Sequence, residues 1–128
     1  MPAAVSNRFP GQHQGENADC AIVALSMYLG VSYEDVLREV ALVDKRNKGR
    51  IGLWTRQIKQ VARRLGHELV VKRKVDLDED YGILLLFDHI AVLRNGLLLE
   101  TNGEVWDIHD YLAALDNISV EGILVVPE

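Results

Sequence analysis

The chain has 128 residues, of which 48% are hydrophobic and 26% are charged, a balance that fits one globular domain over residues 1–128 and excludes a disordered or fibrous protein. Residues 1–14 lack a basic region followed by an apolar run, and no stretch approaches the roughly 20 apolar residues of a membrane span. We therefore expect a cytoplasmic, unprocessed protein that makes no membrane contact. The single cysteine excludes an internal disulfide and a multi-thiolate zinc site within the chain.

Basic residues are unevenly distributed within the net charge of −5. Eleven of the 14 lysines and arginines lie between Lys45 and Lys74, where Glu68 is the only acidic residue. One interpretation is a face that binds an anionic partner; the other is a solvated basic face balanced by an acidic stretch. That stretch consists of Asp76, Asp78, Glu79 and Asp80.

The first predicted helix follows an extended lead-in over residues 1–15, which is rich in proline, glycine and polar residues. Asp19 is suited to cap a helix over residues 20–29, and Gly30 is suited to end it in the left-handed conformation. Because this segment is apolar nearly all round, we expect the helix to be buried.

Two further helices are predicted from apolar periodicity. Ser32 and Asp35 form a variant of the capping box before a stripe that should pack on the first helix, made of Val36, Leu37, Val40 and Ala41. A third stripe, with a basic outer face and an end at Gly66, is made of Trp54, Ile58, Val61, Ala62 and Leu65.

Strand patterns dominate the rest of the chain, over residues 69–71, 83–87, 89–93, 97–101 and 118–126. A short helix over residues 110–115 interrupts them. Helices followed mostly by strands indicate an α+β fold, in which N-terminal helices pack on a C-terminal, mostly antiparallel sheet.

Cys20 is the first candidate for chemistry, because it falls in the first turn of the buried helix. Unpaired backbone N–H groups and the helix dipole favour an anion there, and a thiolate is the form of cysteine that attacks a carbonyl carbon. The alternative is a cysteine that merely starts a buried helix. Gln14 lies six residues earlier, and its amide could form an oxyanion hole with the backbone N–H of Cys20.

His89 is the candidate base, and a predicted hairpin supplies its partner. Asn95-Gly96 between two apolar runs is the strongest short-range signal of a two-residue hairpin turn. If Arg94 faces Leu97, the same register puts His89 opposite Asn102, within about 5 Å between Cβ atoms. We expect Asn102 to orient the imidazole, with Glu100, diagonal on the same face, as the second choice.

The other three histidines are weaker candidates for a catalytic base. His13 lies in the lead-in, His67 follows Gly66, and His109 lies in an acidic corner. A metal site built from His89, His109 and neighbouring carboxylates lacks ligand spacing, so we expect neither a metal nor a cofactor.

The order Gln14, Cys20, His89, Asn102 resembles the papain-like cysteine peptidases, and within them the bacteriocin-processing peptidase domains of export transporters and their small bacterial and phage relatives. The Gln14 to Cys20 spacing, the Asp19-Cys20 pair and the run from His89 to Leu93 are similar to that family's motifs. Ala21 departs from the family, which usually has glycine there. The resemblance implies a papain-like fold and a Cys-His-Asn triad acting on a peptide or protein substrate.

The sequence thus favours a cysteine-nucleophile hydrolase, a peptidase or isopeptidase in which Cys20 attacks, His89 transfers the proton, Asn102 orients His89 and Gln14 supports the oxyanion. Two alternatives stay open. One is an acyl transferase of the transglutaminase or deamidase type. The other is a non-catalytic module that binds nucleic acid or another anionic partner through Arg56, Lys59, Arg63 and Arg64, with Lys72, Arg73 and Lys74.

Overall fold

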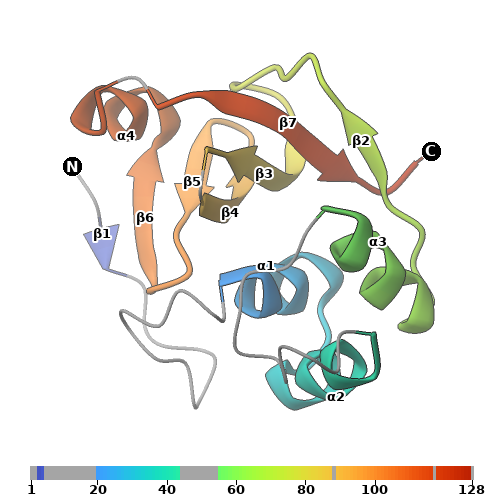
Figure 1. The fold of residues 1–128 in the computed structure, drawn as a ribbon. Coiled ribbons are helices and arrows are strands. Elements are labelled where there is room, and N and C mark those ends of the chain that lie inside the picture. Colours follow the sequence, from blue (N-terminus) through green and yellow to red (C-terminus); the bar gives the residue numbers. More distant parts are fainter. Residues whose placement is uncertain (1–2, 5–19, 44–54, 88, 117, 128) are drawn as a thin grey trace.

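The computed structural model describes residues 3–4, 20–43, 55–87, 89–116 and 118–127. Within these residues the protein is α+β, with three helices from the first half of the chain packed against an antiparallel sheet, as the sequence predicts (Figure 1). The helices are α1 (Cys20–Leu29), α2 (Tyr33–Val43), α3 (Thr55–Arg64) and α4 (Ile108–Ala114).

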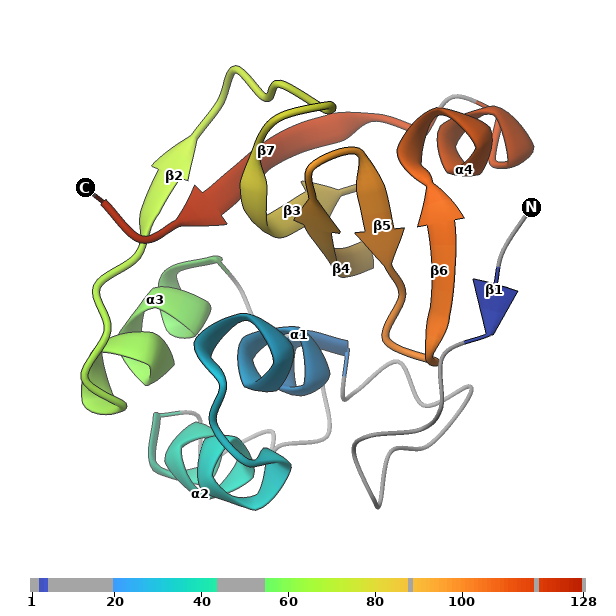
Figure 2. The ribbon, with the colours of Figure 1, turned by 180° about the vertical axis from the view of Figure 1, so that it is seen from behind.

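The strands form one sheet with the order β1-β6-β5-β4-β3-β7-β2, and every pairing in it is antiparallel. They are β1 (Ala3–Ala4), β2 (Val70–Lys72), β3 (Tyr81–Leu86), β4 (His89–Arg94), β5 (Leu97–Leu99), β6 (Glu104–Asp107) and β7 (Val120–Val125). Seen from behind, β1 lies at one edge beside β6, and β2 lies at the other edge beside β7 (Figure 2). The central strands β3 and β4 are therefore hydrogen-bonded to a neighbouring strand on both sides.

Alternating residues of the central strands divide the core into two clusters. Ile83, Leu85 and Val92 face α1, α2 and α3, whereas Leu84 and Leu93 belong to the cluster that includes α4. Because side chains alternate across a strand, each central strand reads as a continuous apolar run. His89 shares the parity of Leu93, which places it at the end of the sheet on the side of α4.

The helix ends follow the predicted local chemistry. α1 spans the predicted residues, and Gly30 ends it with φ 72. The Ser32 hydroxyl accepts a hydrogen bond from the Asp35 N–H at 3.1 Å, which is the predicted cap of α2. Ala41 is exposed rather than part of the buried stripe, because α2 turns only Val36 and Val40 fully into the core. The predicted cap Asp19 and the predicted stripe residue Trp54 lie outside the described residues.

Two short strands were not predicted. β6 continues the sheet after β5, because β5 ends at Leu99 and the chain turns through residues 100–103. β1 pairs Ala3 with Val105 and Ala4 with Glu104, so these two residues of the expected extended lead-in form a short edge strand. Pairs this short carry too few residues to produce an alternating pattern that a sequence would display.

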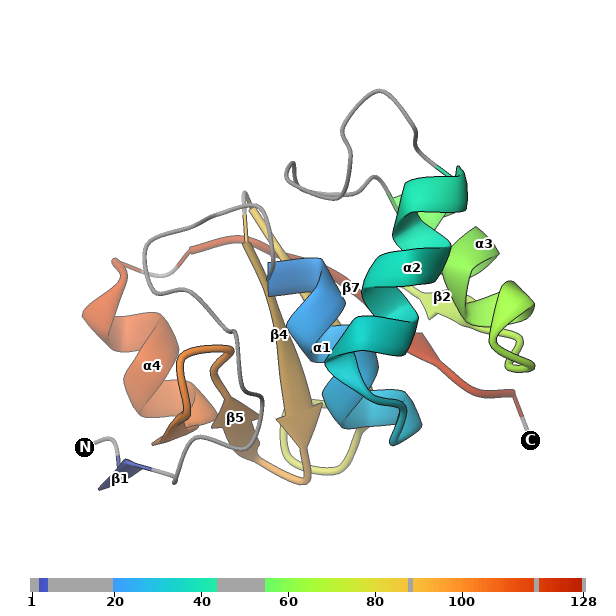
Figure 3. The ribbon, with the colours of Figure 1, turned by 90° about the horizontal axis from the view of Figure 1, so that it is seen from below.

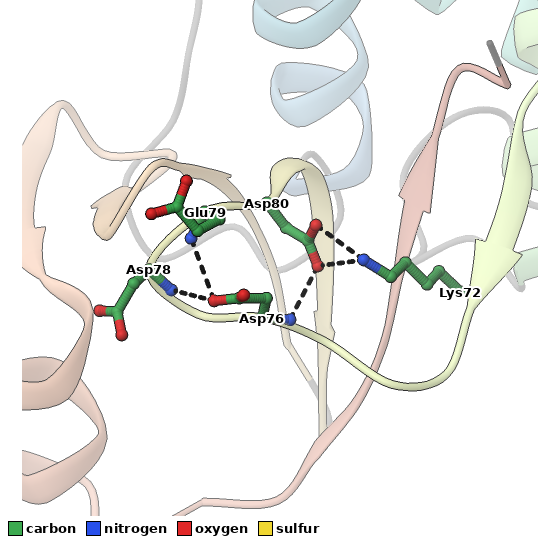
Figure 4. A network of polar contacts seen from close by, with 5 residues as sticks. All are labelled: Lys72, Asp76, Asp78, Glu79 and Asp80. Atoms are coloured by element: carbon green, nitrogen blue, oxygen red, sulfur yellow. Dashed lines mark hydrogen bonds and ion pairs between the residues drawn. The ribbon is translucent and has the colours of Figure 1, made fainter.

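The acidic stretch forms a loop between β2 and β3 that is closed by hydrogen bonds to its own carboxylates (Figure 4). The Asp76 carboxylate accepts the backbone N–H groups of Asp78 and Glu79 at 3.1 and 3.2 Å, and Asp80 accepts that of Asp76 at 2.8 Å. Lys72 donates to both oxygens of Asp80 at 2.8 Å. The ion pair of Lys72 with Asp80 joins the basic segment to the acidic one, as the interpretation of a charge-balanced face predicts.

Gly82 of β3 tests the packing of the sheet. An added Cβ would overlap the Leu124 carbonyl oxygen and lie 2.8 and 2.9 Å from side-chain atoms of Val125 and Ile123. We expect Gly82→Ala to lower the free energy of unfolding in urea by about 3 kcal/mol, because packed strands must separate. Gly30→Ala, which meets open space but strains a positive φ, should cost only about 1 kcal/mol. Equal costs would contradict the described packing.

Candidate functional site

Cys20 is the first residue of α1 and its side chain is partly buried. The helix body behind it is buried from Ala21 to Ser26, which fixes the position of the first turn against the sheet. Figure 3 shows that α1 begins beside the end of the sheet where β4 starts. The sulfur is therefore carried by a rigid element, at the helix end that favours a negative charge.

His89 is the first residue of β4 and lies next to Cys20. The Cys20 side chain is hydrogen-bonded to the imidazole, and the His89 Nε2 donates to the Glu100 Oε1 at 2.7 Å. Because Glu100 occupies Nε2, Nδ1 is the ring nitrogen that remains for the thiol. Cys20 at the start of α1, His89 at the start of β4 and Glu100 just after β5 are thus joined by a chain of hydrogen bonds.

Glu100 is held on three sides. Its Oε1 accepts from His89 and from the Thr101 backbone N–H at 3.0 Å, and its Oε2 accepts from the Tyr111 hydroxyl at 2.6 Å. Burial by itself raises the pKa of Glu100, but the hydrogen bond and charge of His89, followed by the bonds from Tyr111 and Thr101, outweigh it and lower that pKa. The carboxylate therefore stays ionised although its side chain is only 11% exposed.

The predicted partner of His89 needs a correction. The register is the predicted one, with Arg94 opposite Leu97, but the ladder between β4 and β5 stops at Val92 and Leu99. Asn102 then lies in the turn, exposed, where its Oδ1 accepts the Glu104 backbone N–H at 3.0 Å. Glu100, the second choice from the sequence, contacts His89 instead.

Gln14, the candidate oxyanion donor, lies outside the described residues. Tyr111 was not foreseen at all. Its contact with Glu100 depends on how α4 packs beside β5 and β6, which no local pattern in the sequence encodes. The only sequence signal was the apolar face of the short predicted helix, from which a tyrosine hydroxyl had to find a polar partner.

The surroundings of His89 favour its protonated form. The hydrogen bond with Cys20, then that with Glu100 and the attraction of both negative groups, outweigh burial and raise the pKa of His89 from 6.5 to about 10. An imidazolium hydrogen-bonded to a cysteine side chain can serve as the proton donor that acyl transfer requires.

This pKa leads to a direct prediction. At about pH 8.5 an imidazole with the ordinary pKa is almost entirely neutral. We expect ¹⁵N NMR to show His89 protonated at both nitrogens at that pH. Because the folded-state pKa is raised, the stabilisation from this proton is fully present below pH 6.5 and lost as the pH rises through about 10. A neutral His89 spectrum at about pH 8.5 would contradict the described contacts.

Several residues of the basic face that the sequence offered to an anionic partner are bonded to other groups of the protein itself. Arg64 donates to Glu39, Lys72 to Asp80, and Arg73 to the Glu121 carbonyl at 3.0 Å. Arg56 and Arg63 are exposed on α3, and Lys59 is partly buried there. Internal pairs of this kind are what a solvated, charge-balanced face contains.

The described ranges hold no cluster of three or more histidine, cysteine, aspartate or glutamate side chains arranged for a metal ion. Among the helices of those ranges, none is long and apolar enough to cross a membrane. Comparisons with protein-family models, with curated proteins and with solved structures found no match. The functional argument therefore depends on the site itself.

Proposed function

We propose that the protein is a cysteine-nucleophile hydrolase of the papain-like class, a peptidase or isopeptidase, in which Cys20, His89 and Glu100 form the catalytic triad. One observation carries this proposal: the side chain of Cys20 at a helix N-terminus is bonded to an imidazole whose other nitrogen is bonded to an ionised, three-fold hydrogen-bonded carboxylate. This is the arrangement of nucleophile, base and orienting group that acyl transfer requires.

In the proposed reaction the Cys20 thiolate attacks the carbonyl carbon of an amide, and the carbonyl oxygen becomes an oxyanion. The His89 imidazolium then gives its proton to the leaving nitrogen, the carbon–nitrogen bond breaks, and a thioester with Cys20 remains. Water attacks the thioester while His89 accepts a proton from it; the carbon–sulfur bond then breaks, the carboxylic acid leaves, and the Cys20 thiolate and His89 imidazolium are restored. Glu100 keeps the ring oriented and stabilises its charge in both steps.

Gln14 keeps its proposed place as the side-chain donor to the oxyanion, together with the backbone N–H of Cys20. Asn102 does not keep its proposed place, because its amide is used in the turn at Glu104. A non-catalytic module that holds an anionic partner through α3 would explain neither the bond between Cys20 and His89 nor the buried carboxylate. An acyl transferase would use the same three residues and replace water by an amine.

The proposal is tested by incubating the protein with a mixture of denatured proteins and identifying new chain termini by mass spectrometry. We expect termini that appear with the wild type and are lost in Cys20→Ala, a loss of about 10⁴-fold in rate or more. An added primary amine that becomes joined to the new carboxyl ends would identify an acyl transferase. Termini that appear equally with both proteins, or with neither, would contradict the proposed chemistry.

A further inference from the structure

Tyr111 closes the hydrogen-bond chain on the side away from Cys20. Its hydroxyl donates to the Glu100 Oε2 at 2.6 Å, and the residue is 7% exposed. Burial, then the bond and charge of Glu100, raise the pKa of Tyr111, so the phenol is protonated and acts as a donor. Both carboxylate oxygens of Glu100 are therefore occupied, one by His89 and one by Tyr111.

The tyrosine ring is itself fixed. Trp106 meets it edge to face, with ring centroids 5.5 Å apart and planes at 77°. The Trp106 Nε1 donates to the Glu104 Oε1 at 3.1 Å, which anchors the indole on β6. A carboxylate free at one oxygen can rotate about its last torsion, whereas one held at both oxygens by fixed donors cannot.

We propose that Tyr111 is a positioning residue of the site, which acts through Glu100 to hold the His89 imidazolium against Cys20. This inference rests on the proposed function, since it assigns Tyr111 a role in the same reaction. The charged and titratable groups around Glu100 are His89 from β4 and Tyr111 from α4, with Cys20 beyond His89 and Glu104 near Tyr111. Tyr111 itself has no contact with the reacting atoms in this assignment.

The test compares Tyr111→Phe with the wild type in the reaction of Cys20 with iodoacetamide at about pH 6. Phenylalanine keeps the buried ring and removes only the hydroxyl, so we expect the reaction to slow by about fivefold. Tyr28→Phe is the matched control, because it also removes a bonded hydroxyl, which accepts the Val126 N–H at 2.9 Å. Tyr28→Phe should leave the rate unchanged.

A second readout separates positioning from a general loss of packing. In ¹³C NMR the carboxyl of Glu100 should titrate at a higher pH in Tyr111→Phe, because the lost bond had lowered its pKa. In a Glu100→Gln background, Tyr111→Phe should cause little further loss of rate, since its route of action is gone. Equal losses in both backgrounds, or an unmoved Glu100 titration, would overturn the proposal.

Failure of this inference differs from failure of the proposed function. If wild-type Cys20 reacts fast and Tyr111→Phe reacts equally fast, the role of Tyr111 is overturned and the triad stands. If wild-type Cys20 reacts no faster than a free thiol, the triad fails whatever Tyr111 does.

Discussion

Replacing His89 with glutamine is expected to slow the reaction of Cys20 with iodoacetamide at about pH 6 by roughly 100-fold. A cysteine without a cationic partner holds only about 0.3% thiolate at that pH, whereas a thiol bonded to an imidazolium is held as the reactive anion. Glutamine still donates a hydrogen bond to Glu100, so the buried carboxylate keeps a partner and the fold should persist. The measurement is the rate of mass increase of the intact protein.

The matched control is His109→Gln. His109 also bonds to a carboxylate, that of Asp78, at 2.9 Å, but it is exposed and belongs to α4. Its replacement should change the rate at which Cys20 reacts with iodoacetamide by less than about twofold. If both glutamine variants reacted like the wild type, Cys20 would not depend on its imidazole neighbour and the assignment of a base would be lost.

The second large effect concerns the third member of the triad. Glu100→Gln is expected to slow the reaction of Cys20 at about pH 6 by roughly tenfold or more, because the imidazolium loses its negative partner. Asn102→Ala should change the rate by less than about twofold, since its amide serves only the turn at Glu104. The comparison decides between the two residues that the hairpin register offered.

Circular dichroism and the unfolding midpoint in urea serve as controls for both variants. Glutamine is close in shape to glutamate. Its one oxygen can keep the hydrogen bond from the Thr101 N–H while its NH₂ group donates to the Tyr111 hydroxyl, so the site should remain packed. The reverse result is a Cys20 that reacts slowly in Asn102→Ala and at the wild-type rate in Glu100→Gln. It would restore the sequence-based assignment and contradict the geometry described for residues 89–104.

Local chemistry explains which parts of the fold the sequence could predict. The bounds of α1, the cap at Ser32 and the register of Arg94 with Leu97 each depend on a few neighbouring residues. Apolar periodicity and the Asn95-Gly96 turn therefore predicted them well. The approach of Cys20 to His89 was expected from the resemblance to the papain-like peptidases and not from any local pattern.

Tertiary packing explains what the sequence could not predict. If the pairing of β4 with β5 continued beyond Leu99, His89 would lie opposite Asn102. The pairing ends at Leu99, however, and the chain turns there. That turn moves Glu100 toward His89 and leaves Asn102 exposed. The Tyr111 contact requires α4 to pack beside β5 and β6, a long-range event that neither propensity nor spacing encodes.

The sharpest test of a reactive thiol compares one sulfur in two states of the same chain. Cys20 is the only cysteine, so its rate with iodoacetamide at about pH 6 can be measured in the folded protein and again in urea, where it is an ordinary thiol. A folded protein that reacts at least about tenfold faster is the predicted result. A folded protein that reacts more slowly than the unfolded chain would mean that the sulfur is buried filler and that the protein has no cysteine nucleophile.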